Sequence, residues 1–82
     1  MDLSNGTDLN QALVSALKLG IMHACYGDRP ATASALIQLI AKGEPIYYCN
    51  GHARLLRTAY GSGFNAVKFN IRVHKTRQAA KV

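Results

Sequence analysis

The second half of this 82-residue chain contains no acidic residue. All four carboxylates lie at or before Glu44, whereas seven of the ten lysine and arginine residues follow it, so the net charge of +6 divides into −1 for residues 1–44 and +7 for residues 45–82. A charge split this sharp indicates a polyanionic partner for the second half. That partner is either DNA or RNA, or an acidic protein surface, because both select the same basic residues.

The sequence also has few cysteines and no long apolar run. Two cysteines are too few for a disulfide framework, so each is expected to be a small buried hydrophobe. The longest apolar stretch, residues 12–26, is interrupted by three polar residues and is shorter than the roughly 20 residues of a membrane span. No basic residue precedes an apolar segment at the N-terminus, which argues against a signal peptide. These absences predict a cytoplasmic protein with no membrane partner.

What the chain does contain is a large apolar fraction, 49%, with only 17% charged residues. This composition supports a compact core and argues against an intrinsically disordered protein. A chain of this length has enough side chains for one core, so a single domain is expected over residues 1–82. Residues 1–6 and 76–82 lack periodicity and are expected to be flexible.

A first helix is predicted at about residues 8–25. Thr7 and Asp8 supply an N-cap and a carboxylate in the first turn, and apolar residues follow at helical spacing. Gly20 costs about 1 kcal/mol relative to alanine inside a helix, so its presence suggests that another backbone passes close to it.

A second helix is predicted at about residues 31–42. Pro30 suits the opening turn, Gly43 suits the left-handed position after a helix, and Pro45 prevents continuation. The broad apolar faces of both helices leave room for a homodimer interface, although they suit the core of a monomer equally well.

A small sheet is predicted for the second half. Residues 45–49 favour a strand, and after a turn at 61–63 a second strand is expected at about 66–74. Four apolar residues alternate with polar ones in it: Val67, Phe69, Ile71 and Val73. The predicted fold class is therefore α+β, with two N-terminal helices packed on a small C-terminal sheet.

Residues 52–60 allow two interpretations. Asn50-Gly51 is a strong hairpin signal, which would return this segment as a third strand. Alternatively, Asn50 caps a short helix in which Leu55 and Leu56 share a face. The segment does not alternate with a period of two, which favours the helix.

The candidate nucleic-acid contacts all lie in the second half. They are Arg54, Arg57, Lys68, Arg72, His74, Lys75 and Arg77. On a strand, side chains two residues apart project the same way about 7 Å apart, roughly the spacing of successive phosphates, so Lys68 and Arg72 could follow a phosphate backbone. The competing structural interpretation is that an exposed strand face is polar in any case and that bases protect a sheet edge from aggregation.

No motif predicts catalysis, a cofactor or a metal site. His23, Cys25, Cys49 and His52 are residues of the kinds that bind zinc, and four such ligands could complete a zinc site. However, His23 and Cys25 lie two residues apart on a predicted helix, where their side chains would diverge by about 200°. No nucleophile is paired with an oriented base, and no phosphate-binding loop is present. We therefore expect a non-enzymatic protein that binds DNA or RNA through phosphates. The alternative is a small regulator or inhibitor, of the kind that phages and mobile elements encode, which binds an acidic surface of a protein partner.

Overall fold

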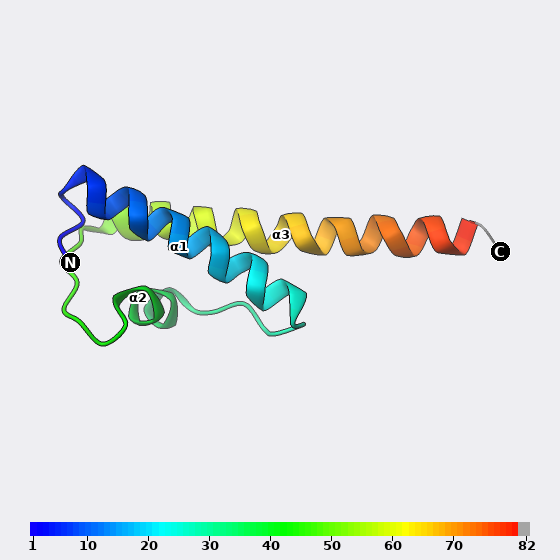
Figure 1. Cartoon of the computed structure of the whole chain (residues 1–82), viewed down its shortest axis with the longest axis horizontal. Helices are drawn as coiled ribbons and strands as arrows, with labels where there is room; N and C mark the ends of the chain where they lie inside the picture. Colours follow the sequence, from blue (N-terminus) through cyan, green and yellow to red (C-terminus); the bar gives the residue numbers. More distant parts are fainter. Residues whose placement is uncertain (81–82) are drawn as a thin grey trace.

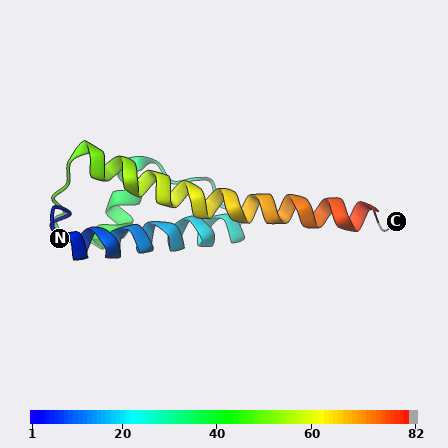
Figure 2. The ribbon, with the colours of Figure 1, turned by 90° about the horizontal axis from the view of Figure 1, so that it is seen from above.

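The computed structural model describes residues 1–80, with side chains as far as residue 73, and these residues form three helices. α1 spans Gly6–Cys25, α2 spans Ala33–Ala41 and α3 spans Asn50–Ala80. The long helices α1 and α3 lie side by side and run in the same direction, and the short α2 lies across one face of the pair (Figure 1). Figure 2 shows that α3 continues well past the end of α1.

The predicted α+β fold is therefore wrong. Within the described residues there is no sheet, and residues 66–74, predicted as a strand, belong to α3. The alternation that suggested a strand also places Val67 and Ile71 four residues apart, which is helical spacing. β propensity depends on the packing that a side chain finds, and lengthening an existing helix costs far less than starting one. Of the two interpretations of residues 52–60, the helix is confirmed.

The segment 45–49, also predicted as a strand, contributes only an isolated β-bridge. Tyr47 pairs in parallel with Asp2. The amide of Leu3 donates to the carbonyl oxygen of Tyr47 (2.9 Å), and the amide of Tyr47 donates to that of Met1 (2.8 Å). Leu3 is completely buried by this arrangement, so the N-terminal lead-in contributes a side chain to the core.

The helices predicted at 8–25 and 31–42 agree with α1 and α2 to within two residues at each end. The cap of α1 is Asn5, whose side chain accepts a hydrogen bond from the Thr7 amide (3.0 Å), rather than Thr7 itself. α2 ends in the left-handed backbone conformation expected there, which both Lys42 and Gly43 adopt.

The core lies between α1 and α3 and under α2. Its buried members are Leu3, Ala12, Ala16, Ala24, Leu36, Ile37, Ile40, Leu56, Tyr60 and Phe64. The small side chains on α1 leave room for the large ones on α2 and α3, which is how facing helical surfaces fill space without voids. Packing in this core therefore holds α1 and α3 against each other along the length of α1.

Two glycines allow α1 and α3 to approach closely. A Cβ atom on Gly20 would collide with the carbonyl oxygen of Tyr60, and one on Gly63 would lie 2.6 Å from the carbonyl oxygen of Leu17. The close backbone approach predicted for Gly20 is confirmed. The same contact explains why residues 61–63, whose composition suggested a turn, are helical: Gly63 serves packing between helices rather than a change of chain direction.

Candidate nucleic-acid interface

Four of the predicted contacts lie on one side of α3. They are Arg54, Arg57, Lys68 and Arg72, which together we call the basic face. At 100° per residue their positions fall within an arc of about 60°, and they span about 27 Å along the helix axis. Lys68 is half-buried and the three arginines are exposed. The sequence divided these residues between a strand and a segment of uncertain structure, whereas one helix brings all four into a single row.

α3 carries no acidic residue that could offset these bases. Between Arg57 and Lys68, the same side of the helix bears Gly61 and Asn65, which are both uncharged. The basic residues therefore produce a positive potential along this side of the helix, which attracts anions before contact is made.

The ammonium group of Lys68 lies over an aromatic ring. Its Nζ lies 5.5 Å from the centroid of the Phe64 ring, a cation–π geometry. Phe64 is itself buried and stacks on Tyr60, with ring centroids 6.2 Å apart. Lys68 is thus already positioned on the basic face, which reduces the conformational entropy that it loses when an anion binds.

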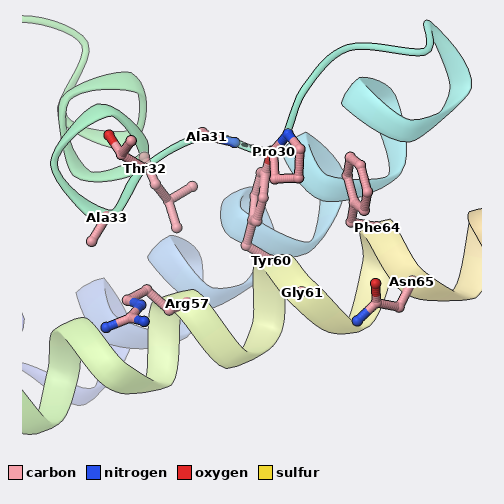
Figure 3. A pocket seen from close by; sticks show the side chains of 10 residues that line it. Pro30, Ala31, Thr32, Ala33, Arg57, Tyr60, Gly61, Phe64 and Asn65 are labelled. Carbon is pink, nitrogen blue, oxygen red and sulfur yellow. Dashed lines mark hydrogen bonds between the residues drawn. The ribbon is translucent and has the colours of Figure 1, made fainter.

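An open pocket of about 510 Å³ lies beside the basic face, where the chain enters α2. The rings of Pro30, Tyr60 and Phe64 line it, and Arg57 and Asn65 reach it from α3 on either side of Gly61 (Figure 3). The pocket therefore combines an apolar interior with one guanidinium from the basic face.

Tyr60 connects α3 to the loop between α1 and α2. Its hydroxyl oxygen accepts a hydrogen bond from the Ala31 amide (2.9 Å) and lies 2.6 Å from Nδ1 of His23. The hydroxyl has one proton and two lone pairs, so it can accept from the Ala31 N–H and also form a hydrogen bond with His23 Nδ1. These contacts hold one wall of the pocket in place. Sequence reasoning missed this role, although Tyr60 lies one turn after Leu56 and so shares its buried face.

Three predicted contacts, His74, Lys75 and Arg77, lie outside the residues whose side chains the structure describes. The end predicted to be flexible, 76–82, lies outside them as well.

The prediction that both cysteines are buried is wrong, because Cys25 and Cys49 are exposed. Among the described residues, no group of three or more histidine, cysteine, aspartate or glutamate side chains could hold a metal ion.

No protein-family model, curated protein or solved structure matches the chain. A search of the described residues finds no helix with the length and hydropathy needed to cross a bilayer.

Proposed function

We propose that this chain is a non-enzymatic protein that binds nucleic acid through phosphate contacts made by the basic face. The observation that carries the proposal is the concentration of Arg54, Arg57, Lys68 and Arg72 in one arc of a helix that has no acidic residue. Phosphate contacts of this kind supply affinity and position a protein on a duplex, but they do not read sequence.

The spacing within the basic face suits a phosphate backbone. Arg54 and Arg57, and likewise Lys68 and Arg72, lie one helical turn apart, which separates their Cβ atoms by about 6 Å. This is close to the distance between successive phosphates along one strand, about 7 Å. Each pair can therefore contact neighbouring phosphates of the same strand.

The shape of α3 supports the same proposal. An α-helix with its side chains is about 10–12 Å across, which matches the width of the major groove of DNA, about 12 Å. The last part of α3 extends past the end of α1, so neither of the other two described helices lies beside it there (Figure 2). Lys68 and Arg72 lie toward this end and can approach a duplex without interference from α1.

The experiment is a salt titration of binding to a fluorescent duplex and to a single strand, measured by fluorescence anisotropy. Four phosphate contacts predict a slope of about −3.6 for log K against log salt concentration on the duplex, equivalent to an affinity loss of about 150-fold between about 50 and 200 mM salt. Lys68→Gln should make the slope shallower by about 0.9, because one phosphate contact is lost.

The matched control is Lys18→Gln, which removes the same charge from an exposed lysine of α1, outside the basic face. It should leave the salt slope unchanged. Equal effects of the two substitutions would show that net charge alone determines binding, and would reject the basic face as the interface. If neither nucleic acid bound at low salt, the proposal would fail. Retention of a protein partner from nuclease-treated lysate would then favour the acidic protein surface.

A further inference from the structure

One face of the layer formed by α1 and α3 has no helix packed on it among the described residues. The short α2 covers the opposite face (Figure 1), and Figure 2 looks onto the uncovered one with α2 behind. Its large apolar side chains are Val14, Leu17 and Ile21 from α1 and Leu55 and Phe69 from α3, each between 39% and 63% exposed. We call this surface the open face. Several large apolar side chains exposed side by side are characteristic of an interaction surface.

The sequence of α3 repeats along the open face with the spacing of a helix-packing seam. The residues of this seam are Leu55, Ala59, Ser62, Ala66 and Phe69. Their spacing of four, three, four and three residues is the heptad pattern of helices that pack along their length. The contact with α1 uses a different seam, formed by Leu56, Tyr60, Gly63 and Val67. In this second seam Ala59 packs against the edge of the core, and no helix in the described part of the chain covers the seam as a whole.

The large and the small residues of the open face occupy different parts of it. Its α1 side presents the larger residues Val14, Leu17 and Ile21, whereas the middle of its α3 side presents Ala59, Ser62 and Ala66, which are small. In a two-fold symmetric interface, each part of a patch contacts a different part of the same patch on the partner. A second copy can therefore place its α1 ridge on the small residues of α3, and receive the same contact in return.

The distribution of charge also favours a second copy. None of the residues named on the open face is charged, although the chain carries a net charge of +6. At 100° per residue, the seam and the basic face are centred about 125° apart around α3, so the basic face lies to one side of the open face. A contact through the open faces therefore leaves both basic faces outside the interface, whereas a contact through the basic faces would bring like charges together.

The available area is close to that of a stable interface. α1 has 20 residues and is therefore about 30 Å long. Two adjacent helices, each about 10 Å wide, present a face on the order of 600 Å², compared with about 800 Å² per partner in a standard interface. We propose that a second copy of this chain occupies the open face and forms a two-fold symmetric dimer.

Sedimentation equilibrium of the whole chain, at concentrations up to on the order of 200 µM, tests this proposal. The expected result is a reversible monomer–dimer equilibrium. Leu55→Glu should raise the dimer dissociation constant by about tenfold or more, because it buries a carboxylate in each copy of an apolar interface. Val14→Glu should do the same from α1, and provides a second test in case one variant does not fold. Far-UV circular dichroism establishes that each variant is helical.

The matched control is Leu39→Glu. Leu39 is 45% exposed and Leu55 is 48% exposed, but Leu39 belongs to α2, which lies on the opposite face. Leu39→Glu should dimerise as the wild type does. The proposal is overturned by a monomer at every concentration, or by a dimer on which all three substitutions have equal effects. Binding of a monomeric chain to vesicles of neutral lipid, abolished by Leu55→Glu, would also overturn it by assigning the open face to a membrane surface.

Discussion

Replacing Gly63 with alanine tests the contact between α1 and α3 directly. The new Cβ would lie 2.6 Å from the carbonyl oxygen of Leu17, 3.0 Å from its Cδ1 and 3.1 Å from Cγ1 of Ile21. The two side-chain atoms can rotate away. The carbonyl oxygen belongs to the backbone of α1, so it cannot move unless the two helices separate. In a core packed at the density of a crystal, such a shift opens gaps elsewhere.

Two opposing effects determine the sign of the change. Alanine favours a helix interior over glycine by about 1 kcal/mol. Adding a methyl group to a closely packed contact costs about 1–3 kcal/mol through strain and displacement. Because the nearest atom is backbone and the distance is well inside van der Waals contact, we expect the upper part of this range. Gly63→Ala should therefore lower the free energy of unfolding by about 1–2 kcal/mol.

Gly61→Ala is the control, because Gly61 belongs to the same helix only two residues away. A Cβ atom there would meet nothing within 4 Å. Only the helix preference remains, so this substitution should raise the free energy of unfolding by about 0.5–1 kcal/mol. Two identical substitutions in one turn of helix are thus expected to have opposite signs.

Urea unfolding followed by far-UV circular dichroism, at one fixed protein concentration, measures both variants. For a domain of this size, each 1 kcal/mol also shifts the melting temperature by about 4–8 °C, so thermal melts give a second reading. A Gly63→Ala chain at least as stable as the wild type would refute the close approach of α1 and α3. A Gly61→Ala chain less stable than the wild type would show that residues 61–63 form a turn, as their composition suggested.

Two further predictions concern hydrogen bonds of single side chains. Tyr60→Phe removes the hydroxyl that accepts from the Ala31 amide and should lower the free energy of unfolding by about 1–3 kcal/mol in urea titrations, whereas Tyr26→Phe, at an exposed tyrosine, should have almost no effect. Hydrogen bonds from the Ser4 hydroxyl and amide lower the pKa of the Asp2 carboxyl, so ionised Asp2 stabilises the fold above its unfolded-state pKa and loses this contribution as the pH falls through its folded-state pKa. The unfolding midpoints of wild type and Asp2→Asn, measured against pH, should therefore differ at neutral pH and converge in acid; a constant difference would contradict this.

The helices that were predicted correctly have local signals at their ends. α2 stops where Gly43 adopts a left-handed conformation and Pro45 follows, and both effects arise within a few residues of chain. The strand predicted at 66–74 failed because its alternating apolar residues also fit helical seams. The choice between a strand and a helix depends on Gly63, which packs against Leu17, 46 positions earlier in the chain. No local pattern could supply that information.

The candidate site could be predicted in composition but not in arrangement. Net charge does not depend on fold, so the seven bases after Glu44 indicated the relevant half of the chain from the sequence alone. Which bases are neighbours does depend on fold: the predicted strand already placed Lys68 and Arg72 on one side, but only the continuous helix brings Arg54 and Arg57 into the same row. The Lys68–Phe64 contact likewise requires residues four apart to be neighbours: on a helix they are about 6 Å apart, whereas on a strand they would share a face but lie about 13 Å apart.

The helical form of α3 is also what separates its two proposed surfaces. Leu55, Leu56 and Arg57 are consecutive, and at 100° per residue they point to the open face, the core and the basic face in turn. Their exposure follows this order, since Leu56 is fully buried and its two neighbours are exposed. On a strand, Leu55 and Arg57 would share one side, and a dimer through the leucine would cover the arginine. On this helix a partner on the open face leaves the basic face accessible, so dimerisation and nucleic-acid binding can occur together, and either proposal can fail without the other.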